Sequence, residues 1–102
     1  MTRPLTVTQR AQADIDEHAA YLDDRSPSAG ERFLAELAQV FDRLVTFPAI
    51  GQRCPTNHHP RLRRAVLPTF PVSVFYRSST VAVEVLRVLH HARDISPLLD
   101  EI

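Results

Sequence analysis

The chain of 102 residues lacks lysine and tryptophan and has one cysteine and two glycines. Because Cys54 is alone, a disulfide framework is excluded, and we expect a protein of a reducing, cytoplasmic compartment. Gly30 and Gly51 are too few and too far apart for a glycine-rich phosphate loop. No apolar run approaches the ~20 residues of a membrane span, and residues 1–10 lack an apolar signal-peptide core, so we expect no membrane association.

Since lysine is absent, arginine supplies all twelve basic side chains. The formal net charge is zero, but residues 1–50 carry eight acids and five arginines, whereas residues 51–102 carry seven arginines and four acids. Between residues 52 and 93, Glu84 is the only acid. Arginine suits bidentate contact with carboxylate or phosphate. This basic segment predicts an acidic partner, either protein or nucleic acid, although a solvated basic surface is an equal alternative.

Apolar spacing predicts two helices joined by a short connection, which makes an antiparallel helical hairpin. The first begins at Gln9 with Thr8 as its N-cap, and its acidic residues are expected to form a solvated face. The second has Ser26 as its N-cap and Pro27 at its first position, and it ends before Pro48. Its predicted buried stripe consists of Phe33, Leu37, Val40, Phe41 and Leu44. Two further apolar residues, Leu34 and Val45, flank this stripe.

Several β-branched runs predict strands around this hairpin. The last of them is apolar on nearly every residue, so we expect a central strand covered on both faces. The first run after the hairpin carries arginines on both faces and is typical of a sheet edge. The order β-α-α-β-β-β predicts a single α+β domain (residues 1–102) with a helical hairpin on a mainly antiparallel sheet. The expected strands are 4–8, 61–67, 72–77 and 81–90. Residues 47–60 are expected to form a loop, and residues 92–102 a C-terminal tail.

Two histidine pairs, His58–His59 and His90–His91, suggest metal or acid–base chemistry. Adjacent residues of a strand point to opposite faces, so His90 and His91 cannot share one ion, and we expect no metal site. A histidine at a strand end can act as an acid or a base near neutral pH. The competing interpretation is that it caps the strand through a backbone carbonyl.

Arginines inside the strands are the other candidates. Alternation predicts that Arg61 and Arg63 share one strand face, while Arg64 lies on the other. These residues suit either phosphate contacts or the protection of a strand edge.

Arg87 lies inside the most apolar strand, on the predicted face of Val83, Val85 and Leu89, so it needs an acidic partner. Glu84 is on the opposite face, and we expect that partner on another strand, the tail or another molecule. Arg93 and Asp94 could pair with each other or brace the tail.

Four short motifs follow one another along the chain: "RF" at 32–33, "FPAIG" at 47–51, "FPVSVFYR" at 70–77 and "VLRVLHHARD" at 85–94. Through them the chain resembles ParE-type toxins of the RelE/ParE toxin–antitoxin superfamily, over nearly its whole length. The resemblance implies a small bacterial toxin, associated with plasmid stabilization, that inhibits DNA gyrase and is neutralised by a ParD-like antitoxin.

The resemblance further implies a protein-binding poison rather than an enzyme. We expect no cofactor, no metal and no specific nucleic-acid binding by the toxin alone. The antitoxin would dock in an apolar groove and pair with arginines. We therefore expect Arg87→Ala to reduce toxicity or antitoxin affinity and to leave the fold largely intact. The residues expected to face the target or antitoxin are Arg63, Arg64, Arg87, Arg93, Leu34 and Val45.

Two alternatives stay open. The first is a RelE-like, ribosome-dependent mRNA endoribonuclease that uses Arg64, Arg87 and His90. The tyrosine common beside the strand end is replaced by His91, and the lysines of some RelE-like enzymes are absent, so the sequence fits ParE better. The second alternative is a small basic nucleic-acid-binding module that uses residues 52–93.

Overall fold

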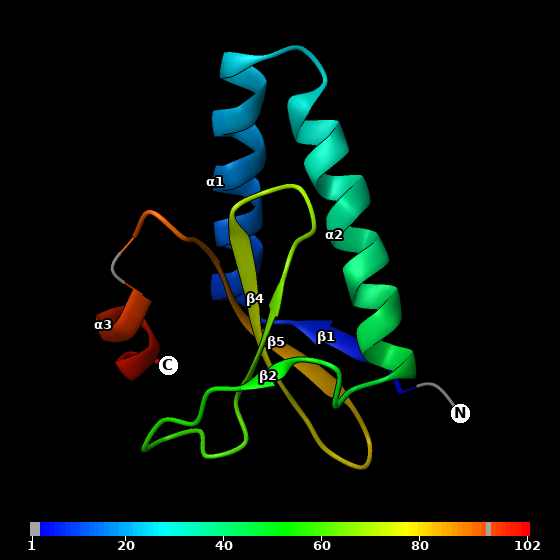
Figure 1. The fold of residues 1–102 in the computed structure, drawn as a ribbon, viewed down its shortest axis with the longest axis vertical. Helices are drawn as coiled ribbons and strands as arrows, with labels where there is room; N and C mark the ends of the chain where they lie inside the picture. Colours follow the sequence, from blue (N-terminus) through cyan, green and yellow to red (C-terminus); the bar gives the residue numbers. More distant parts are fainter. Residues whose placement is uncertain (1–2, 94) are drawn as a thin grey trace.

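The computed structural model describes residues 3–93 and 95–102 and confirms the α+β fold (Figure 1). Helices α1 and α2 form a hairpin beside a five-stranded sheet of order β1-β5-β4-β3-β2. Strand β1 runs parallel to β5, and the other pairs are antiparallel. Within the described residues, no helix is both long and apolar enough to cross a membrane. The elements are β1 (Leu5–Val7), α1 (Gln9–Arg25), α2 (Ala29–Thr46), β2 (Gln52–Arg53), β3 (Arg63–Val66), β4 (Val72–Ser78), β5 (Val83–His90) and α3 (Ile95–Asp100).

The two helices begin differently from each other. Thr8 caps α1 as predicted, because its Oγ1 accepts the N–H of Ala11 at 3.1 Å. The prediction that Ser26 caps α2 is wrong. Helix α1 runs on to Arg25, and Ser26 ends it by donating its N–H to the carbonyl of Leu22. The N-cap of α2 is Ser28, which adopts a left-handed conformation with φ of 64°.

A close contact at Gly30 holds the helical hairpin together. The N–H of Gly30 donates to Asp23 Oδ1 of α1 at 2.9 Å. A Cβ at this position would lie 2.5 Å from the same oxygen and 2.8 Å from the carbonyl of Ala19. Only glycine therefore lets the start of α2 approach the end of α1 this closely.

Strand β5 is central as predicted, between β1 and β4. The prediction that the 61–67 strand forms the sheet edge is wrong, because β2 pairs with it through Arg53↔Arg63 and Gln52↔Arg64. Strand β2 falls in the segment 47–60 that was expected to be loop. Its two residues are too few to give a recognisable alternation.

A bulge in β5 changes which residues share a face. Phe75 of β4 pairs with Arg87, but the next residue, Tyr76, pairs with Val85, so Leu86 has no partner on β4. Val85 joins the core under the helices, whereas Leu86 and Leu89 join a second core. The prediction that Leu89 shares a face with Val83 and Val85 is therefore wrong.

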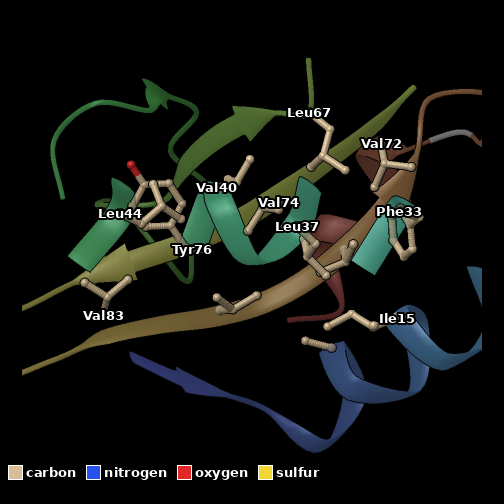
Figure 2. Packing of buried hydrophobic residues seen from close by; sticks show 13 residues of the cluster. Ile15, Phe33, Leu37, Val40, Leu44, Leu67, Val72, Val74, Tyr76 and Val83 are labelled. Carbon is tan, nitrogen blue, oxygen red and sulfur yellow. The ribbon is translucent and has the colours of Figure 1, made fainter. Parts of the chain in front are cut away.

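The two faces of the sheet carry separate cores. The larger one lies between the helical hairpin and the sheet, where Leu37 and Leu44 of α2 pack against Val74 and Tyr76 (Figure 2). The predicted stripe of α2 is confirmed at its buried members, and Phe41 is partly buried. On the other face, α3 folds back over the sheet, so the tail packs on its own chain. This smaller core contains Leu62, Phe75, Leu86 and Leu89, covered by Ile95, Leu98, Leu99 and Ile102.

Candidate interaction site

Arg87 is paired inside the protein. Its Nε donates to Asp14 Oδ2 at 2.8 Å and its Nη2 donates to Asp14 Oδ1 at 3.1 Å. Both side chains are only 3% exposed. The partner comes from α1, which corrects two expectations: that it would lie on a strand, the tail or another molecule, and that the acids of α1 form only a solvated face. Arg87 has no exposed guanidinium to offer a partner.

The same carboxylate also completes the edge of β5. Strand β1 pairs with β5 only as far as Val85. Beyond that point, side chains at the start of α1 take over: Asp14 Oδ2 accepts the N–H of Val88 at 3.0 Å, and the hydroxyl of Thr8 donates to the carbonyl of Leu86 at 3.1 Å. His18 Nε2 lies 3.1 Å from the carbonyl of Val88. These contacts satisfy backbone groups that would otherwise be buried without a partner.

Arg63 binds the loop after α2. Its Nη1 donates to the carbonyls of Gly51 at 2.7 Å and Ala49 at 3.2 Å. The buried hydroxyl of Tyr76 joins the same loop, because it accepts the N–H of Gly51 at 2.8 Å and donates to the carbonyl of Pro48 at 2.8 Å. Burial raises the pKa of Tyr76, so the phenol stays protonated and keeps both bonds. The "FPAIG" and "FPVSVFYR" motifs therefore meet in one structural contact.

Arg64 is the predicted arginine best placed to meet a partner. Its Nε donates to the buried Oγ of Ser73 at 2.7 Å, and this oxygen lies 2.7 Å from His91 Nε2. Its guanidinium also lies over the ring of Phe75, 5.7 Å from the centroid. These contacts fix the half-buried arginine through Nε, while its terminal nitrogens have no bonded partner among residues 3–93 and 95–102. A guanidinium held in this way is pre-organised for a carboxylate or phosphate.

His91 and His90 are separated as predicted. His91 turns toward Ser73, whereas His90 Nδ1 accepts the N–H of Ala92 at 2.9 Å and caps the end of β5. Desolvation, followed by the positive charge of Arg64 and then His90, lowers the pKa of His91. The histidine beside Arg64 is thus neutral at physiological pH, which lets its Nε2 accept the hydroxyl of Ser73. Sequence reasoning missed this link, because nothing in the "FPVSVFYR" motif marks Ser73 as a partner of Arg64 or His91.

The other predicted contact residues are dispersed. Leu34 is exposed on α2, Val45 is half-buried near the end of the same helix, and Arg93 is exposed after β5. The expected pairing of Arg93 with Asp94 falls outside the described residues. Beyond these, the structure exposes an apolar group that the sequence did not single out, consisting of Phe47, Ile50 and Val66.

Cys54 is half-buried beside the second core and has no disulfide partner. Burial raises the pKa of its thiol, so it is not an activated nucleophile. Within the described residues, no group of three potential ligands could hold a metal ion.

Comparisons with known proteins agree with this fold. A family model described as the ParE toxin of the type II toxin–antitoxin system parDE matches residues 5–95. The Sinorhizobium fredii protein Y4kP, whose name gives it provisionally as a toxin, is 34% identical over 83 residues, covering 81% of this chain and 82% of that protein.

Two solved structures share the fold at low sequence identity. A chain of the chromosomal ParDE system from P. aeruginosa aligns with a TM-score of 0.73 and 20% identity, over 87% of this chain and 96% of that one. A chain of the toxin–antitoxin complex RelBE2 from Mycobacterium tuberculosis aligns with a TM-score of 0.63 and 19% identity, over 88% of this chain and 99% of that one. By the family model and the curated relative together, the chain belongs to the ParE toxin family of type II toxin–antitoxin systems.

Proposed function

We propose that the protein is a toxin that inhibits DNA gyrase by binding and is neutralised by a ParD-like antitoxin. The observation that carries this proposal is the ParE family match over residues 5–95. The structural relatives are chains of the ParDE system and of the RelBE2 toxin–antitoxin complex, which supports an antitoxin partner. Binding, rather than chemistry, is the proposed mode of action in the cytoplasm.

Arg64 is the proposed anchor for an acidic partner. Its Nε is occupied by Ser73, and its terminal nitrogens are left for a carboxylate. Arg93, Leu34 and Val45 are proposed as secondary contacts on the surface. Arg63 and Arg87 act indirectly, since one holds the loop after α2 and the other fixes α1 to β5.

One geometric observation favours RelE-like mRNA cleavage as a second candidate function. Arg64, Ser73 and His91 form a continuous hydrogen-bonded line, so a cation for a phosphate lies beside a histidine able to carry a proton. This set differs from the Arg64, Arg87 and His90 set inferred from the resemblance. Arg87 is occupied by Asp14, and His90 caps its strand.

Parallel assays separate the two functions. Purified protein is added to a gyrase supercoiling reaction and, separately, to translating ribosomes with a defined mRNA. The proposed function predicts loss of supercoiling with intact mRNA. Codon-linked cleavage with normal supercoiling would instead establish the ribonuclease function. His91→Gln is tested in both assays. If His91 has only a structural role, this variant leaves gyrase inhibition unchanged.

The antitoxin is tested independently of the target. The neighbouring reading frame should encode a short acidic protein that binds this chain and restores supercoiling. Binding is measured by calorimetry with the purified pair. A neighbouring product that neither binds nor restores gyrase activity would contradict the proposal.

A further inference from the structure

A second polar site lies on the sheet face that α3 covers, at the end away from Ser73 and His91. Residues of the loop before β3 and of the turn between β4 and β5, two segments at the bottom of Figure 1, lie around it. Together with Thr6 of β1 they line a cavity of about 410 Å³ that opens to solvent. This volume is within the range of small-ligand sites, which is roughly 300–1,000 Å³. None of the residues proposed above to contact gyrase or the antitoxin lines this cavity.

Polar and charged side chains that line the cavity contact one another, with Arg77 between Glu84 and His59. Arg77 Nε donates to Glu84 Oε1 at 2.8 Å, and Nη2 forms an ion pair with the same oxygen at 2.8 Å. Its Nη1 lies 3.1 Å from His59 Nδ1. A guanidinium has only donors, so this histidine nitrogen must be the acceptor, and the ring proton must sit on Nε2. The contact with Arg77 therefore leaves the Nε2–H of His59 as a donor without a partner among the described residues.

Arg61 supplies the unbalanced charge. It lines the same cavity, and among residues 3–93 and 95–102 its side chain has no hydrogen-bond or ion-pair partner. Because Arg77 offsets Glu84, the guanidinium of Arg61 is left as a positive charge without a counter-charge in the cavity lining. The hydroxyls of Thr6 and Ser78 add further donors to the lining.

We propose that this cavity binds the phosphomonoester group of a small hydroxylated ligand, such as a sugar phosphate. A phosphomonoester is close to a dianion near pH 7 and offers three acceptor oxygens, which suits Arg61, Arg77 and the Nε2–H of His59. The Oε2 atom of Glu84 is not used by Arg77, so it accepts a hydroxyl of the same ligand. Recognition of both groups distinguishes a phosphorylated metabolite from a simple anion.

Isothermal titration of the full chain with ribose 5-phosphate tests this site. We expect saturable 1:1 binding that is tighter than that of inorganic phosphate at the same ionic strength. Arg61→Gln should weaken it about tenfold or more, because a charge-assisted contact is lost. Arg53→Gln is the matched control, since Arg53 is also exposed and basic but does not line the cavity. Ala82→Phe should abolish binding without changing charge, because it fills the cavity.

A pair of short oligonucleotides, one 5′-phosphorylated and one with a 5′-hydroxyl, separates the sources of the phosphomonoester. If the phosphorylated oligonucleotide binds, the 5′-hydroxyl one does not, and the binding is lost in Arg61→Gln, a nucleic-acid end is identified as the natural ligand. The absence of oligonucleotide binding, with ribose 5-phosphate bound, would identify a free metabolite. The proposal is overturned if ribose 5-phosphate does not saturate, if the 5′-hydroxyl oligonucleotide binds equally well, or if Arg53→Gln weakens binding as much as Arg61→Gln.

Discussion

Asp14 of α1 holds Arg87 of β5 by two hydrogen bonds and, through the same carboxylate, the N–H of Val88. One acid thus fixes the first helix against the central strand. Removing either charged partner leaves the other buried and unpaired, which costs about 3–5 kcal/mol. We expect Arg87→Ala and Asp14→Ala each to lower the free energy of unfolding by that amount in urea denaturation.

An apolar replacement of the pair provides the control. The double variant Asp14→Leu with Arg87→Met should recover stability relative to either single Ala variant, because no buried charge is left. The sequence alone led us to expect that Arg87→Ala leaves the fold largely intact. That expectation predicts no loss in the free energy of unfolding. An unchanged urea midpoint would support that expectation and would refute the structural role given to Arg87.

The loop after α2 should depend on the hydroxyl of Tyr76. Tyr76→Phe leaves the N–H of Gly51 and the carbonyl of Pro48 without their partner, at a cost of about 1–3 kcal/mol. The variant should also be cut faster by protease between residues 47 and 53. Tyr21→Phe is the control because Tyr21 is exposed. Equal effects of the two variants would show that the buried phenol contributes nothing specific.

Two leucines of α2 separate core packing from surface contact. Leu37 is 3% exposed and Leu34 is 44% exposed. Leu37→Ala should destabilise the protein by ~2–5 kcal/mol through the cavity it leaves. Leu34→Ala should change stability by less than about 0.5 kcal/mol, so any loss of antitoxin affinity would then come from the contact itself. Thermal unfolding and calorimetry measure the two effects, and comparable losses of stability would contradict this assignment.

His91 should make stability depend on pH in the acidic range. Its folded-state pKa lies below the ordinary value of 6.5, so the unfolded chain binds the proton more readily. The contribution of neutral His91 is therefore complete above pH 6.5 and is lost as the pH falls through the folded-state pKa. Wild type should lose stability over this window relative to His91→Gln. Parallel pH profiles of the two proteins would rule out the coupling.

Arg64 should matter for binding and not for folding. Arg64→Gln removes the charge offered to an acidic partner, and we expect antitoxin affinity to fall about tenfold or more. Arg53→Gln removes an equal charge from the neighbouring strand β2 and serves as the control. Calorimetry with the purified antitoxin measures both. Equal weakening in the two variants would indicate only long-range attraction by the basic segment.

The helices, the main strands and the central place of β5 could be predicted, because apolar spacing reports directly on burial. The partner of Arg87 could not, since Asp14 is 73 residues away in a helix rich in exposed acids. The face assigned to Leu89 failed at a bulge, where one unpaired residue reverses the alternation. The link from Arg64 through Ser73 to His91 depends on strand register, to which a lone serine gives no clue.

The position of β5 has a consequence for synthesis of the protein. Of the described strands it is the last in sequence order, yet it lies between β1 and β4, and the first helix is bonded to its edge. A nascent chain that has not yet released residues 83–90 from the ribosome lacks the strand that joins its two ends. Translation products that end before residue 83 therefore lack the strand with which both β1 and β4 pair, and we expect them to stay unfolded and open to proteolysis.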